Sequence, residues 1–67
     1  MMTDDEVVAF MRDPVWRAAY LAQALRIARN DLATIRPATP MAEALARLAE
    51  RIEEIDHTLA LAGRASS

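Results

Sequence analysis

Apolar residues recur in alternating steps of four and three along the second half of the chain. The series is Met41, Leu45, Leu48, Ile52, Ile55 and Leu59, with Ala62 at its end. This heptad spacing predicts one long helix with a narrow apolar seam, over about residues 40–62. Thr39 and Pro40 are typical of a helix start, and we expect Gly63 to follow the last helical turn. Such a seam needs a second helix to cover it.

The preceding stretch carries a matching heptad pattern. Its members are Ala18, Leu21, Leu25, Ala28, Leu32 and Ile35. They predict a second helix over about residues 14–35. The connection 36–40 is short and contains two prolines, so the two helices should form an antiparallel hairpin. Folding the hairpin places Leu25 opposite Ile52, and we expect the two seams to bury each other along their length.

A short helix should come first, over about residues 4–12. Thr3 and Glu6 form a capping-box pattern at its start. Asp13 followed by Pro14 favours a break there, because aspartate caps a new helix and proline suits its first position. The predicted fold is all-α: an antiparallel helical hairpin preceded by a short N-terminal helix.

Both long helices have further apolar stripes that the hairpin leaves uncovered. On the second helix the stripe is Trp16, Tyr20 and Ile27, and on the third it is the small residues Ala42, Ala46, Ala49 and Ala60. One interpretation is that the first helix folds back and covers Trp16 and Tyr20 with Phe10 and Met11. The other is that hairpins pair into a four-helix bundle or a larger helical oligomer. We favour the oligomer, because about nine residues are too few to cover two long flanks.

Composition supports a small domain that gains stability from partners. The whole chain, 1–67, should be one helical domain, with 64–67 as a frayed tail. A chain of this length buries only about 60% of its unfolded surface, and it has no cysteine for a disulfide. We therefore expect a homo-oligomer. No apolar run is long enough to span a membrane, the N-terminus does not resemble a signal peptide, and we predict a cytoplasmic protein with no membrane partner.

The sequence offers little for catalysis, and we predict no enzyme and no cofactor. There is one histidine and one glycine, and no serine or cysteine lies near the histidine in sequence. Glu54 and His57 have the Glu-x-x-His spacing of helical metal sites, and Glu53 is adjacent. This leaves a metal-binding oligomer as an alternative. The simpler interpretation is a solvated Glu53–His57 pair.

Three arginines share one side of the second predicted helix: Arg26, Arg29 and Arg36. They could hold phosphates, which would make the chain a nucleic-acid-associated regulator or a packaging adaptor. Alternatively they pair with Glu50, Glu53 and Asp56 at matching heights on the third helix. The net charge of −2 argues against a protein that acts mainly by attraction to nucleic acid. We favour the pairing.

We expect a non-enzymatic protein–protein interaction or assembly module that self-associates through helical faces and docks on a larger protein. The expected interface residues are Phe10, Trp16, Tyr20, Ile27, Ala42, Ala46 and Ala49. At the level of fold, a hairpin with spare apolar stripes resembles the oligomerisation parts of small helical adaptors such as phage small-terminase subunits. It also resembles the dimerisation hairpins of small regulators. Fold alone does not assign a function.

Overall fold

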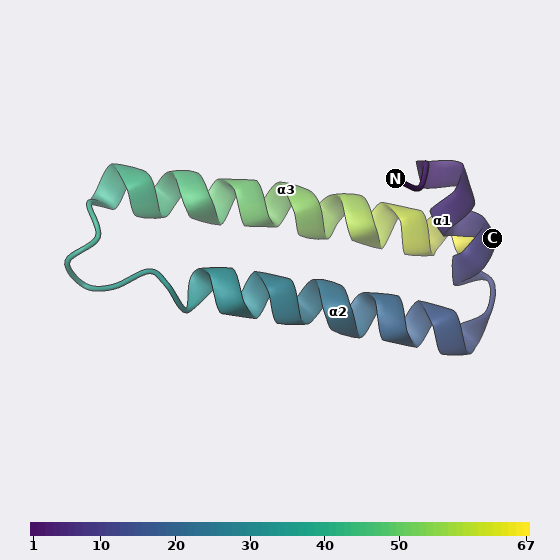
Figure 1. Ribbon diagram of the computed structural model, residues 1–67. Helices are drawn as coiled ribbons and strands as arrows, with labels where there is room; N and C mark the ends of the chain where they lie inside the picture. The colour runs from purple at the N-terminus through teal and green to yellow at the C-terminus, as the bar shows by residue number, and fades with distance from the viewer.

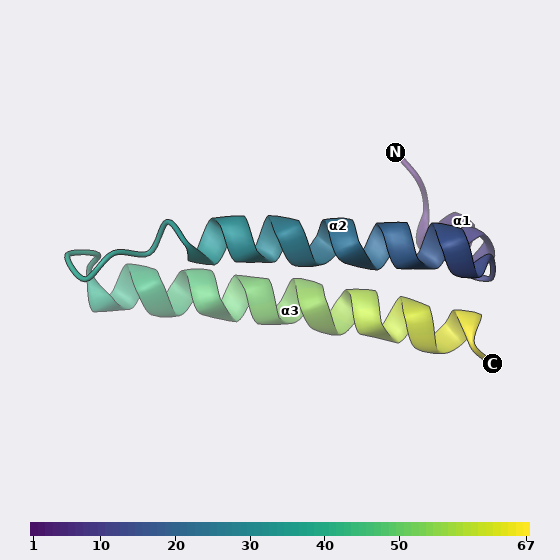
Figure 2. The same cartoon turned by 90° about the horizontal axis from the view of Figure 1, so that it is seen from below.

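The computed structural model describes all 67 residues as three helices without strands. Helix α1 spans Asp4–Met11, α2 spans Pro14–Leu32 and α3 spans Met41–Ala65. Helices α2 and α3 run antiparallel side by side, and α1 lies across the end where α3 finishes (Figures 1 and 2). The prediction of an all-α chain with a short first helix and two longer packed helices is confirmed.

The starts of α1 and α2 follow the capping residues in the sequence. Thr3 Oγ1 accepts a hydrogen bond from the Glu6 amide, and Glu6 Oε1 lies 3.4 Å from the Thr3 nitrogen, which completes the predicted capping box. Asp13 Oδ1 accepts from the Val15 amide at 2.9 Å, and Pro14 is the first residue of α2. Each cap satisfies amide groups that the first helical turn leaves without an internal partner.

The connection between α2 and α3 is longer than predicted. Helix α2 ends at Leu32 instead of continuing to residue 35. The Thr34 hydroxyl donates to the Asp31 carbonyl at 2.7 Å, and the Arg36 amide donates to Thr39 Oγ1 at 2.9 Å. These local bonds offer the backbone an alternative to helix, and Pro37 disfavours helical geometry just before itself. Thr39 therefore stabilises the connection and does not cap α3.

Helix α3 continues beyond the predicted end at residue 62. Gly63 lies inside the helix and has no positive φ, so its predicted role after the last turn is wrong. Ala65 is buried, and Arg64 Nη2 forms an ion pair with Asp5 Oδ1 at 2.7 Å. These contacts with α1 hold the last turn in place. The first two residues of the predicted tail at 64–67 thus belong to α3.

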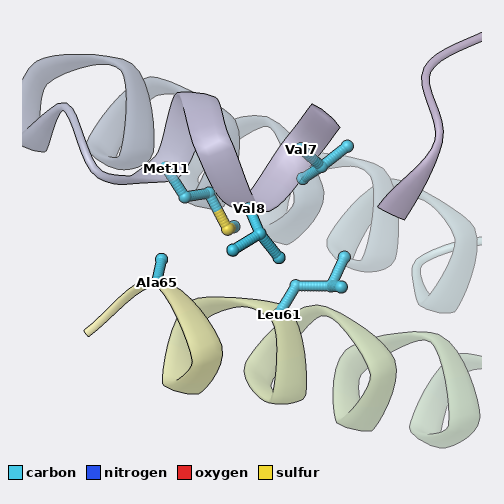
Figure 3. Packing of buried hydrophobic residues seen from close by; sticks show 5 residues of the cluster. All are labelled: Val7, Val8, Met11, Leu61 and Ala65. Carbon is cyan, nitrogen blue, oxygen red and sulfur yellow. The ribbon is translucent and has the colours of Figure 1, made fainter. Parts of the chain in front are cut away.

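The main hydrophobic core lies where α1 crosses the end of α3. Its five members are Val7, Val8, Met11, Leu61 and Ala65. Figure 3 shows the two valines and the methionine of α1 pointing toward the two residues of α3. Met11 is fully buried. The only other buried residue of the chain is Ala28, in α2.

The hairpin does not bury the two heptad seams against each other. Helix α3 turns another face toward α2, with Arg47 and Arg51 contacting Asp31. At 100° per residue, this face is rotated by about 90° from the heptad seam. The predicted burial is therefore wrong for the α3 seam, whereas in the α2 seam Ala28 is buried and Leu21 and Leu32 are half-buried. The α1 core and the arginine contacts together fix the rotation of α3.

Candidate protein-interaction face

The heptad residues of α3 form an exposed apolar row. We call them the α3 row: Met41, Leu45, Leu48, Ile52, Ile55 and Leu59. Each is between 37 and 72% exposed. Their spacing places all six within a sector of about 80° around the helix. A continuous stripe of this length is unusual on the surface of a monomer and is typical of an interaction surface.

A groove between α2 and α3 extends this row onto α2. Its volume is about 340 Å³, and most of its lining is apolar. Leu21 and Leu25 of α2 lie across it from Ile55 and Leu59 of α3. The groove stays open because small side chains such as Ala24 meet between the helices. The α3 row together with Leu21 and Leu25 makes one surface, which we call the open face.

Helix α1 cannot cover the open face, because it packs on a different side of α3. It contacts Leu61 and Ala65, and Leu61 lies roughly 160° around the helix from the centre of the α3 row. Asp4 and Asp5 of α1 also reach residues of α3 away from the row. Apart from Leu21, which is half-buried and packs against the edge of this core, the open face is thus left exposed.

The aromatic residues form an internal stack. The rings of Phe10 and Trp16 are stacked at 5.2 Å between centroids, and those of Trp16 and Tyr20 at 5.1 Å. Trp16 and Tyr20 are half-buried and pack against the α1 core. This is the arrangement in which α1 folds back onto α2. The role of these three residues as interface anchors stays a prediction.

Other residues of the predicted interface are exposed. Ile27 lies on α2 at the margin of the groove. The alanine stripe of α3 is Ala42, Ala46, Ala49 and Ala60, and all four are exposed. It lies about 110° from the α3 row, on the side away from α2. Sequence reasoning placed the uncovered surface on this stripe, whereas the structure leaves the larger residues of the row uncovered as well.

Asp31 holds α2 and α3 together by charge. Its carboxylate oxygens lie 3.1 Å from Arg47 Nη2 and 3.2 Å from Arg51 Nε, and Arg51 also pairs with Glu54 at 2.7 Å. Arg51 is mostly buried. Sequence reasoning missed this cluster. Its signal was that Asp31 is the only acidic residue of α2, near the end that faces the arginines of α3.

The histidine contacts α1 and not its own helix. His57 Nε2 lies 3.2 Å from Asp4 Oδ1, so the predicted Glu53–His57 pair is wrong. No group of three or more histidine, cysteine, aspartate or glutamate side chains is arranged to hold a metal ion. Glu53, Glu54 and His57 are therefore not assembled into a metal site within one chain.

The predicted arginine pairing does not occur within the chain. Arg26, Arg29 and Arg36 are exposed, and none of them forms an ion pair. The same is true of their expected partners, which are Glu50, Glu53 and Asp56. The reason is the rotation of α3, which turns these acids away from α2. Complementary charges are therefore present on both helices but left unpaired.

The molecule is more extended than a self-contained chain of its size. It exposes 5022 Å², whereas a folded chain of 7.4 kDa ordinarily exposes about 4200 Å². Its radius of gyration is 14.2 Å, against about 11 Å for a compact domain of this length. The excess surface, about 800 Å², agrees with an apolar face that lacks its cover.

No helix combines the length and the apolar character that crossing a membrane requires. Comparison with known protein families, curated proteins and solved structures finds no match to this chain. The function is therefore argued from the geometry of the open face.

Proposed function

We propose that this chain is a non-enzymatic assembly module that associates through the open face and presents its remaining surface to a larger protein. The observation that carries the proposal is the α3 row, six large apolar side chains at heptad spacing that no part of the chain covers. Heptad spacing matters here because it is the pattern by which one helix packs along another. Scattered exposed apolar residues would not have this meaning.

The extended shape of the chain supports the same proposal, because the chain exposes about 800 Å² more than a compact protein of its mass. The rim of the face is charged and its centre is apolar, as in interfaces generally. Once the open face is covered, Ile27 and the alanine stripe remain exposed, and we propose them as contacts for the larger protein.

Light scattering with size-exclusion chromatography tests the proposal. The unmodified chain should have an average mass above that of a monomer. The fraction of chains that are assembled should increase with concentration. Leu48→Glu should shift it to monomer, because it places a charge at the middle of the α3 row. Val15→Glu is the matched control, because Val15 is apolar and 80% exposed but lies outside the open face. It should leave the mass unchanged.

Circular dichroism separates loss of association from loss of folding. Leu48 is exposed within one chain, so the variant should keep its helices. A chain that is monomeric at all concentrations and indifferent to Leu48→Glu would contradict the proposal.

The three unpaired arginines support a second candidate, a nucleic-acid-associated regulator or packaging adaptor. Arg26, Arg29 and Arg36 carry no carboxylate partner and are open to phosphates. Binding would then weaken steeply with salt. Titration of a duplex and of a single strand at low salt tests this candidate, and no binding to either would remove it.

A further inference from the structure

We propose that the occupant of the open face is a second copy of this chain, placed so that α3 of each copy packs along α2 of the other. The two copies would be related by a two-fold axis parallel to the helices and would form a four-helix bundle. The inference rests on the proposed function and specifies the partner and its orientation. Its support is the register of the apolar residues and the placement of the unpaired charges.

The register follows from the groove. Asp31 of α2 contacts Arg47 and Arg51 of α3, and counting away from this contact along the antiparallel helices places Leu25 at the height of Ile55 and Leu21 at the height of Leu59. All four of these apolar residues line the groove. A rotation about an axis parallel to the helices keeps each residue at its own height. Ile55 therefore faces Leu25 of the partner subunit, and Leu59 faces Leu21 of the partner subunit. The two heptad seams would then meet between chains, in a register that places Leu25 opposite Ile55 and not opposite Ile52 as predicted from the sequence.

The unpaired charges lie on the outer flanks of the open face, with Arg29 and Asp56 next to it and Arg26 and Glu53 farther round their helices. On α2, Arg26 and Arg29 lie on the side away from α3, and on α3, Glu53 and Asp56 lie on the side away from α2. Within one chain these edges are on opposite sides of the hairpin, and their charges cannot meet. The rotation brings the acidic edge of one copy beside the basic edge of the other, at matching heights. Every unpaired arginine of this edge then gains an acidic neighbour.

Charge also argues against the other simple arrangement, in which α3 packs on α3. That arrangement would place like helices side by side. Residues 14–37 carry four arginines and one aspartate, a net charge of +3, and residues 38–67 carry five acids and three arginines, a net charge of −2. Like charges across an interface weaken association and select against a partner. The alternating arrangement places each basic helix between acidic ones.

Helix α1 is compatible with the bundle. It packs beside Leu61 and Ala65, on the far side of the hairpin from the open face. The two copies of α1 would lie on the outside of the bundle, and neither would obstruct the interface.

Charge reversal at the two edges tests the arrangement. Arg26→Glu with Arg29→Glu should weaken dimerisation about tenfold, because two pairs at each edge become repulsive. Glu53→Arg with Asp56→Arg should weaken it to a similar extent. The chain with all four substitutions should recover to within about threefold of the unmodified dimer, because each edge again carries opposite charges. Sedimentation equilibrium at low salt gives the dissociation constants.

A matched control uses the other side of α3. Glu43→Arg with Glu50→Arg makes the same charge change on the same helix, away from the open face. It should leave the dissociation constant of the dimer within about threefold of that of the unmodified chain. A dimer that neither edge variant weakens, or that the fourfold variant does not restore, would overturn this arrangement and leave the proposed function standing. An unmodified chain that stays monomeric, and whose mass does not change with Leu48→Glu, would overturn both this arrangement and the proposed function.

Discussion

The two ends of the hairpin differ in how completely the chain covers its own apolar side chains. At the α1 end, five residues from α1 and α3 form a buried core, and the aromatic stack closes one side of it. Along the rest of the hairpin only Ala28 is buried, and the α3 row is exposed. The first region is finished within one chain. The second has the sequence pattern of a core but no partner within the chain, and the proposed assembly rests on this contrast.

The largest expected effect on stability is at the α1 end of the hairpin. Met11→Ala should lower the free energy of unfolding by about 2–5 kcal/mol, because it removes the one fully buried large side chain and leaves a cavity. Urea denaturation followed by circular dichroism measures the change. Met41→Ala is the matched control, the same substitution at an exposed position of the α3 row. At concentrations where the chain is monomeric, this control should lower the free energy of unfolding by less than about 0.5 kcal/mol. Equal losses for the two variants would show that the two regions do not differ in burial.

The contribution of the α3 row to stability should depend on the concentration of the chain. For Ile52→Ala, the loss of stability should be small in dilute solution and increase to about 2 kcal/mol per chain where the unmodified chain is assembled. The reason is that the side chain is buried only in the assembly. Thermal unfolding over a hundredfold range of concentration measures it. A midpoint that does not depend on concentration, for the unmodified chain and the variant alike, would show that nothing covers the row.

The helix starts at the α1 end could be predicted from the sequence, because local chemistry specifies them. The cap of α1 depends on Thr3 and Glu6, three residues apart, and the break before α2 depends on Asp13 and Pro14. No tertiary information is needed to place them. The three helices follow from these signals and from apolar periodicity.

The rotation of α3 could not be predicted in this way. Heptad spacing defines which residues share a side of a helix, but not which neighbour that side faces. The rotation depends on α1 docking at Leu61 and Ala65 and on Asp31 reaching Arg47 and Arg51. These contacts join residues far apart in the sequence. The predicted Glu53–His57 pair failed for the same reason, because Asp4 approaches the histidine from another helix.

The cap between α1 and α2 should have a smaller effect than the core. Asp13→Ala should cost about 1 kcal/mol, because the amides of Val15 and Trp16 lose their shared acceptor. Glu50→Ala is the control, an exposed acid within a helix that forms no ion pair. Urea denaturation should show almost no change for it. Equal effects at the two positions would mean that the cap contributes nothing particular.

The smallest expected effect is a gain. Gly63→Ala should stabilise the chain by about 0.5–1 kcal/mol, because the residue is helical and a methyl group there meets no atom within 4 Å. The α1 end of the hairpin would thus become more stable without any change at the open face. Denaturation should report the gain, while light scattering should report an unchanged dissociation constant. A destabilised variant would mean that α3 does not continue through this position.

Cross-linking between chains tests the central claim most directly. The native chain has no cysteine, so chains with Leu25→Cys can be mixed with chains carrying Ile55→Cys and oxidised gently. Peptide mass spectrometry of the product distinguishes a link between residues 25 and 55 from any link between identical positions. We predict the 25–55 link, formed between chains and lost when Leu48→Glu is added to both. A link between Leu45→Cys and Ile55→Cys chains, without a 25–55 link, would show that α3 packs on α3 and would contradict the account.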